Sequence, residues 1–180
     1  MARSHTNASS NAKIVRCPEH TLSRLRRLNE AEVITLFTPV VPHPPTTKLA
    51  HDMDPFEPLG RALPRRVRHV PYRLDSGMTE LHCDFLPASG AVVMVVCVAE
   101  NVVRSNARAF EQQLDFATNI STRIQENGAI ADIPTILLLV NGDAAGKIFA
   151  DAMPDFPALV MVNDYTAPAL ADAVRVLFGL

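Results

Sequence analysis

Six polar residues follow the ends of strand-like apolar runs, and their types make them the best candidates in this chain for ligand contacts. They are His43, Glu100, Asn101, Arg104, Asn141 and Asp143, and Lys48 lies in the same proline-rich loop as His43. In an open parallel sheet, ligands bind beyond the carboxyl ends of the strands, where the strand order reverses. The set predicts contacts to a polar ligand at that edge, but it does not assemble into a recognisable catalytic group.

Glu100 is the one candidate for a catalytic acid. It follows the apolar run Ala91–Val98, which places its carboxylate at the sheet edge, where a closed site raises a carboxyl pKa and suits it to general acid–base work. It also precedes a helix-like segment, and a helix dipole favours a solvated carboxylate at that position. We favour the second interpretation and assign no catalytic residue.

The familiar nucleotide, phosphorylation and hydrolase motifs are absent. The segment Gly142–Lys147 follows a strand-like run, but its glycines are too close for a phosphate-binding loop, and Ile148 stands where Ser or Thr should hold Mg²⁺. The first strand ends in Phe37-Thr38-Pro39 without the Asp of a receiver domain, and there is no G-x-G-x-x-G or G-x-S-x-G segment. No Cys/His spacing is typical of zinc. We therefore expect neither a metal nor a cofactor.

Composition predicts one globular domain. The chain has 180 residues, of which 48% are hydrophobic and 20% charged, and its net charge of −2 gives no indication of nucleic acid as a partner. Three Cys argue against a disulfide framework. The longest apolar run, Ala91–Ala99, is far below the roughly 20 residues of a membrane helix. Residues 1–12 are polar and lack a secretory signal, so we expect a disordered tail, no membrane partner and a cytoplasmic location.

Five apolar runs alternate with helix-like segments. The strand-like runs are Val33–Thr38, Val67–Pro71, Ala91–Val98, Thr135–Val140 and Ala158–Val162. The helix-like segments are Asp54–Leu63, Met78–Leu86, Val102–Glu126, Asp143–Ala152 and Ala167–Phe178. This alternation predicts an α/β three-layer sandwich with a mostly parallel sheet in the flavodoxin-like order 2-1-3-4-5. The sheet has five strands, or six if Ile14 and Val15 add an edge strand.

The helix signals are specific at two places. In Val102–Glu126 the residues Ala107, Phe110, Leu114, Ala117, Ile120 and Ile124 recur at helical spacing and predict the buried side. In the last helix, Thr166 is expected to cap the beginning, Pro168 to lie in the first turn and Gly179 to end it. Ser76 is the expected cap of the Met78–Leu86 helix.

The end of the chain is similar to the closing unit of the C-terminal α/β domain of glycoside hydrolase family 3. The similarity consists of an apolar strand, the turn Asp164–Pro168, and a helix that ends in Val176-Leu177-Phe178-Gly179. Further segments resemble the family in the same order: Val33–Pro39, Asp54–Leu63, Val67–Tyr72, Ala91–Val98 and Pro134–Val140. The chain resembles most the branch that contains β-N-acetylglucosaminidases, and the similarity extends over residues 13–180.

The resemblance implies a scaffold and not a complete enzyme. Family members cleave terminal β-linked sugars with retention, which needs two groups flanking the bond. In the β-N-acetylglucosaminidase branch both groups belong to a separate N-terminal barrel, and no position of this chain matches either. In the β-glucosidase branch a Glu from a comparable loop is the acid/base, followed by Gly and then Asp-Arg, whereas Glu100 is followed by Asn101-Val102-Val103-Arg104. The chain is thus expected to pack against a barrel, in cis or in trans, and to border a carbohydrate site without hydrolysing sugar alone. The alternative is a non-catalytic, flavodoxin-like module that binds a small ligand or docks a partner.

Overall fold

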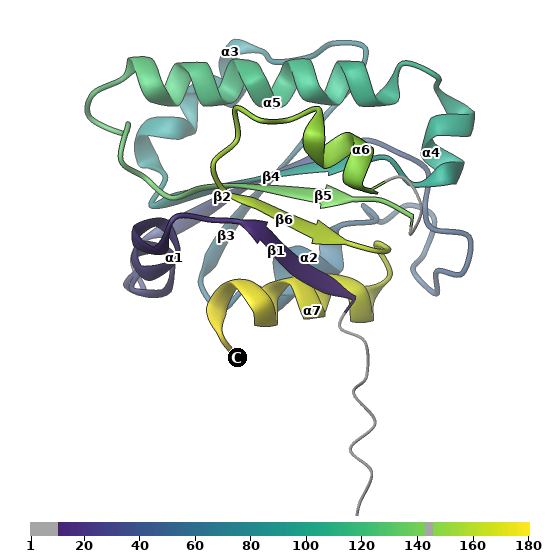
Figure 1. Cartoon of the computed structure of the whole chain (residues 1–180), viewed down its shortest axis with the longest axis horizontal. Coiled ribbons are helices and arrows are strands. Elements are labelled where there is room, and N and C mark those ends of the chain that lie inside the picture. Colours follow the sequence, from purple (N-terminus) through teal and green to yellow (C-terminus); the bar gives the residue numbers. More distant parts are fainter. Residues whose placement is uncertain (1–10, 143–145) are drawn as a thin grey trace, which may run out of the picture.

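Six strands form one sheet, and helices cover both of its faces (Figure 1). The structure is a computed structural model that describes residues 11–142 and 146–180. The strands are β1 (Ala12–Arg16), β2 (Val33–Pro39), β3 (Arg66–Tyr72), β4 (Ala91–Cys97), β5 (Thr135–Val140) and β6 (Leu159–Val162). The helices are α1 (Glu19–Arg26), α2 (Glu57–Ala62), α3 (Glu80–Asp84), the 3-10 turn η1 (Leu86–Ala88), α4 (Glu100–Ser105), α5 (Ala109–Glu126), α6 (Gly146–Asp151) and α7 (Ala167–Phe178).

The strand order confirms the predicted topology. From edge to edge it is β1-β6-β5-β4-β2-β3, and neighbours among β2 to β6 are parallel, which is the flavodoxin-like order. β1 is the sixth strand and pairs antiparallel with β6. Ala12 is its first residue, and the Asn11 amide donates to the Asp172 carboxylate (2.6 Å), which corrects the predicted end of the tail at residue 12. Residues 1–10 lie outside the described part of the chain.

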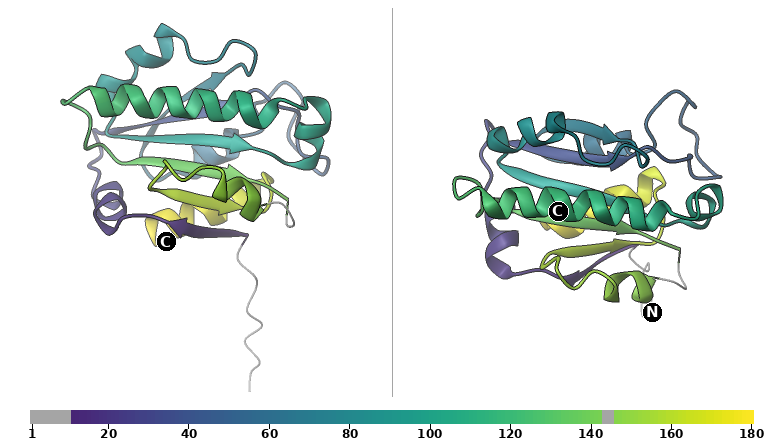
Figure 2. Two further views of the ribbon diagram at one scale, coloured as in Figure 1. Left: turned by 45° about the horizontal axis from the view of Figure 1, so that its top comes forward. Right: turned by 90° about the horizontal axis from the view of Figure 1, so that it is seen from above.

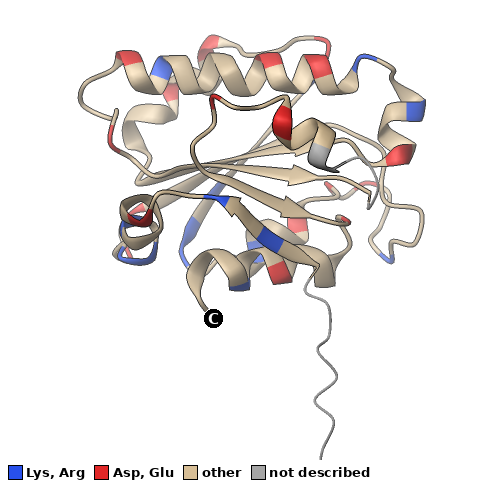
Figure 3. Ribbon diagram, in the orientation of Figure 1, with Lys and Arg blue, Asp and Glu red and all other residues tan. Residues whose placement is uncertain are grey.

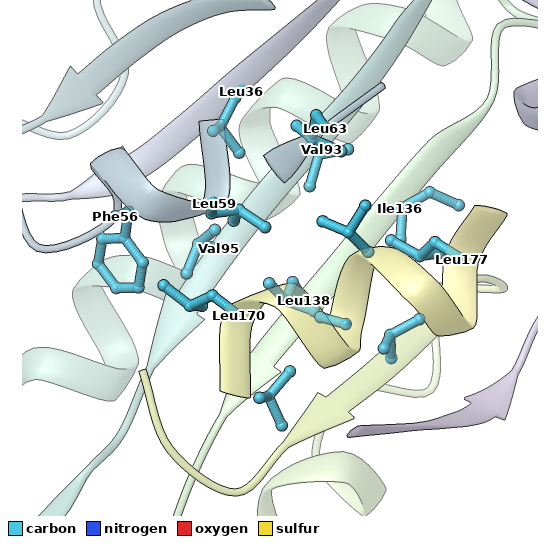
Figure 4. Packing of buried hydrophobic residues seen from close by; sticks show 14 of the residues in the cluster. Leu36, Phe56, Leu59, Leu63, Val93, Val95, Ile136, Leu138, Leu170 and Leu177 are labelled. Atoms are coloured by element: carbon cyan, nitrogen blue, oxygen red, sulfur yellow. The ribbon is translucent and has the colours of Figure 1, made fainter. Parts of the chain in front are cut away.

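Apolar side chains fill both interfaces between the sheet and its helices. All of β4 is buried, as expected for a central strand covered on both faces. Successive side chains of a strand point to opposite faces, so Val93 packs with α1, α2 and α7, whereas Met94 packs with α5, α6 and η1. Figure 2 shows α5 and α7 on opposite sides of the sheet. Figure 4 shows Leu59 of α2 and Leu170 of α7 converging on the centre of the sheet.

The final helix, α7, has the predicted bounds. Thr166 is its N-cap residue, although the Thr166 side chain makes no capping hydrogen bond, and Pro168 lies in the first turn. Gly179 adopts the left-handed conformation (φ 72°) that commonly ends a helix. α2 begins three residues later than predicted, at Glu57, with Pro58 in its first turn, where the missing N–H is tolerated.

The prediction of one long helix over Val102–Glu126 is wrong in one respect, because the structure has two helices there, α4 and α5. Asn106 is extended (φ −149°, ψ 104°), and its side-chain carbonyl accepts a hydrogen bond from the Arg108 N–H (3.0 Å). This turn ends α4 and begins α5 in a new direction, and a short polar side chain that bonds the local backbone commonly makes such a break. The buried side of α5 therefore includes Gln113 and Phe116, while the predicted Phe110 and Leu114 are only half-buried. Within the described ranges, neither α5 nor any other helix is long and apolar enough to cross a membrane.

A capping box fixes the beginning of α3. The cap is Thr79 rather than the predicted Ser76, and the Thr79 N–H donates to Nδ1 of His82 (2.9 Å). The His82 ring packs edge-on against Phe37 and Phe116. Burial lowers the pKa of His82, and hydrogen bonds with the backbone of Pro71 and Thr79 partly oppose this. The ring is therefore neutral in its folded role, with Nδ1 as the acceptor.

Acidification is expected to weaken the fold through His82. As the pH falls through the ordinary histidine range, the unfolded chain takes up a proton before the folded chain, so the free energy of unfolding decreases with falling pH. Gln at this position completes the same capping box without titrating. We expect urea unfolding between pH 7.5 and 5.5 to show a smaller loss of stability for His82→Gln than for the parent chain. Equal losses in the two proteins would contradict this role of His82.

Candidate functional site at the carboxyl edge of the sheet

The loop after β2 is fastened to two other segments at the carboxyl edge. Asn101 of α4 donates one amide hydrogen to the His43 carbonyl (3.0 Å) and the other to the Tyr165 hydroxyl (2.7 Å). The Tyr165 hydroxyl donates in turn to the Pro42 carbonyl (2.7 Å). These segments follow β2, β4 and β6, whose carboxyl ends lie at one edge because the strands are parallel. The structure thus brings together two predicted site residues, His43 and Asn101. Their hydrogen bond holds the loop after β2 in place.

Tyr165 is the centre of this connection, and sequence reasoning assigned it only to a turn. Its side chain is 1% exposed and stacks on Phe56, with ring centroids 5.6 Å apart. Burial raises the pKa of Tyr165 well above the usual tyrosine value, and the hydrogen bond from Asn101 only partly opposes this. The phenol therefore stays protonated and serves as a hydrogen-bond donor rather than as a base.

The imidazole of His43 serves the same loop. Its Nε2 lies 2.7 Å from the Met53 carbonyl, and its ring contacts His51 edge-on with centroids 5.8 Å apart. Lys48, in the same loop, is exposed. The side chain of His43 thus holds the two ends of the loop together.

Glu100 and Arg104 face solvent. Glu100 begins α4, and its carboxylate pairs with the Arg104 guanidinium one helical turn later, at 2.5 Å. Both side chains are about three-quarters exposed (76% and 77%). Figure 3 shows charged residues along the outer helices and loops, whereas the central strands carry none. General acid catalysis needs a carboxyl group enclosed in a site beside the bond that breaks, and this exposed, ion-paired geometry does not provide it.

The two remaining predicted residues follow β5. Asn141 is buried, and its backbone N–H donates to the Val162 carbonyl (3.0 Å), which extends the pairing of β5 with β6. Asp143 lies outside the described residues. Asn141 therefore extends the pairing of the sheet through its backbone, and its side chain is buried rather than exposed on the surface.

A polar cluster that sequence reasoning missed joins β2, β3 and α2. The Thr38 hydroxyl lies 2.8 Å from Nε2 of His69, and the two ring nitrogens lie 3.7 Å from Asp54 and 3.5 Å from Glu57. A hydroxyl, an imidazole and a carboxylate in sequence resemble a hydrolase triad. However, Thr38 is completely buried, so its hydroxyl has no access to a substrate. The cluster holds the beginning of α2 onto the sheet.

A second missed residue, Gln113, holds the end of β4. Its amide accepts from the Cys97 N–H (2.6 Å) and donates to the carbonyls of Cys97 and Ala109 (both 2.9 Å). The residue is completely buried, and hydrogen-bonded polar groups of this kind fix one arrangement of a core. Burial also raises the pKa of the Cys97 thiol to about 12, so this cysteine is not a nucleophile.

An open groove of about 430 Å³ lies at this edge, between the loops after β2 and β3 and the junction of α4 and α5. Val41, Leu74 and Val102 supply apolar surface, and the ion pair of Arg73 with Asp75 (2.8 Å) stands beside them. None of the predicted site residues in the described ranges lines it. Across residues 11–142 and 146–180, no group of His, Cys, Asp and Glu is arranged to hold a metal ion.

Comparison with solved structures identifies the fold. The chain matches part of a fungal multi-domain family 3 β-N-acetylglucosaminidase, a protein that has a GCN5-related glucosamine N-acetyltransferase region. The TM-score is 0.57 and the identity 14%, and the match covers 93% of this chain and 16% of that chain. It matches a family 3 β-N-acetylglucosaminidase from Paenibacillus sp. str. FPU-7 with a TM-score of 0.54 and 16% identity over 93% and 28% of the two chains. A β-glucosidase from Listeria innocua matches with a TM-score of 0.50 and 14% identity over 93% and 23%.

These likenesses confirm the predicted resemblance at the level of the fold. The chain spans less than a third of each of these three enzymes. No protein-family model matches the sequence, and no curated protein matches it.

Proposed function

We propose that this chain is the α/β domain that accompanies the catalytic barrel of a family 3 glycoside hydrolase, of the β-N-acetylglucosaminidase or β-glucosidase type. The observation that carries the proposal is the structural match over 93% of the chain to enzymes of which it spans only a fraction. The ordered sequence resemblance, and above all the turn between β6 and α7, supports the same assignment. A barrel in the same polypeptide, or in a second one, is the partner, and carbohydrate is the ligand of the assembly.

The domain does not hydrolyse glycosides alone. Retaining hydrolysis requires two groups on opposite sides of the scissile bond, held in a closed site. The candidate Glu100 is solvated and paired with Arg104, and the Thr38 hydroxyl beside His69 is completely buried. The domain instead supports the barrel and presents the fastened loop after β2 at the shared boundary.

Turnover by the purified chain tests this proposal. We expect no hydrolysis of aryl β-N-acetylglucosaminide or aryl β-glucoside above the rate of a buffer blank. Hydrolysis that is abolished by Glu100→Gln and retained by the matched surface change Glu111→Gln would overturn it, because Glu111 is also exposed and also paired, with Arg108.

The size of the natural protein tests the partner. An antibody raised against this chain should detect, in the cells that produce it, a polypeptide much larger than 19.7 kDa or a complex with a barrel-containing chain. A free 19.7-kDa monomer would contradict the accessory role. That result would favour the alternative, a small-ligand module that uses the open groove beside Val41 and Leu74, where the strand order reverses between β2 and β4.

A further inference from the structure

A second groove lies at the opposite, amino edge of the sheet, and the proposed function leaves it unused. Its volume is about 490 Å³, within the range of small-molecule sites. It is enclosed by the first turns of α1, the C-terminal part of α5 with the segment that follows, and the residues before β6. Figure 1 shows α1 and the end of α5 on the same side of the molecule.

The floor of this groove is apolar. Ile124 of α5 and Phe156 are only 3% and 5% exposed, and Pro18, Ile133 and Pro157 continue the surface. Such a floor binds the hydrophobic body of a ligand, because contact with it removes apolar surface from water. The two prolines also restrict the backbone on either side of the groove.

One wall is cationic and held in place. Nη1 of Arg24 donates to the Asp132 carbonyl (2.7 Å), so the guanidinium is fixed across the groove by a backbone acceptor rather than neutralised by a carboxylate. The other N–H groups of Arg24 have no hydrogen-bond partner among the described residues. His20 and Thr21, in the first turn of α1, line the same wall, and that end of α1 has no side-chain cap. Together they favour a ligand with a negative group.

The charge of the ligand is limited by Asp132, which also lines the groove. The Asp132 carboxylate repels each further negative charge on a ligand, so a single charge set against Arg24 is favoured over a multiply charged anion. We propose that this groove binds a small monocarboxylate with an apolar body, which sets its carboxylate against Arg24 and its body against Ile124 and Phe156. The site does not depend on the relationship to family 3 hydrolases.

Binding is measured by titrating the ¹⁵N-labelled full chain with benzoate, benzamide and inorganic phosphate, and following the amide chemical shifts. Benzoate should give saturable shifts clustered at the amino-edge groove. Benzamide, which lacks the charge, and phosphate, which lacks the apolar body, should each bind about tenfold more weakly. Absence of saturable benzoate binding, or equal binding of phosphate, would overturn the proposal.

Variants assign the binding to the groove. Arg24→Gln should weaken benzoate binding about tenfold, since a hydrogen bond to a charged group is lost. Arg27→Gln makes the same charge change just beyond α1, at a residue that does not line this groove, and should leave the affinity within about twofold. Asp132→Asn should strengthen binding about threefold by removing the competing charge. A gain in affinity cannot come from misfolding. If Asp132→Asn did not strengthen benzoate binding, or if Arg27→Gln weakened it as much as Arg24→Gln, the proposed site would be wrong.

Discussion

Replacing Gln113 by Leu is expected to lower the free energy of unfolding by about 2–4 kcal/mol. Leucine fills similar space but offers no hydrogen bond, so the N–H and the carbonyl of Cys97 lose their Gln113 partner at a completely buried position. A buried polar group that loses its partner costs far more than the hydrogen bond contributes on balance. Urea unfolding followed by far-UV circular dichroism measures the change.

The matched control lies on the same helix. Gln125 of α5 is exposed, and within the described part of the chain its amide bonds only to the Ser121 hydroxyl, at 3.3 Å. Gln125→Leu should therefore change stability by no more than about 0.5 kcal/mol. If both variants lost the same amount, the loss would reflect leucine in α5, and the assigned role of Gln113 would be wrong.

Gln113 matters for function because β4 ends where α4 begins. Its hydrogen bonds to Cys97 fix the end of the central strand, and Asn101 follows only four residues later. Asn101 then fastens the loop after β2 through the His43 carbonyl and the Tyr165 hydroxyl. The buried amide of Gln113 in α5 thereby helps to fix the position of the loop after β2, which the proposed function places against the barrel.

The sheet was predictable because its signals are local. A run such as Ala91–Val98 is apolar at every position, which is typical of a strand covered on both faces, and the alternation with helices leaves few parallel topologies. The break at Asn106 was not predictable from hydrophobic periodicity, because Val102 and Val103 continue the apolar pattern into α5. The break depends on a side-chain hydrogen bond to the backbone, which spacing does not reveal.

The candidate site was less predictable, since its contacts depend on register. Sequence position correctly placed Asn101 after a central strand, but it gave no reason to pair Asn101 with Tyr165 of the last turn. The His69 cluster requires that Leu36 and His69 be paired in the sheet, which brings Thr38 beside the ring. Pairing register between parallel strands joined by long crossovers is not encoded in either strand alone.

Replacing Phe116 by Ala is expected to have the largest effect of any single change considered, a loss of about 3–5 kcal/mol. The ring is 1% exposed, stacks on Tyr72 with centroids 3.6 Å apart, and contacts Phe37 and His82 edge-on. Truncation leaves a cavity between α5 and the sheet that these neighbours cannot fill without moving.

Phe116→Leu separates volume from stacking. It keeps most of the buried volume and should cost no more than about 1.5 kcal/mol, while it still removes the aromatic contact. The chain has two Tyr and no Trp, so near-ultraviolet circular dichroism reports largely on Tyr72 and Tyr165. We expect Phe116→Leu to reduce this signal while the protein stays folded by far-UV circular dichroism. Because the Tyr72 hydroxyl donates to the Val95 carbonyl (2.9 Å), an unchanged tyrosine signal would mean that this hydrogen bond, and not Phe116, holds the Tyr72 ring in place.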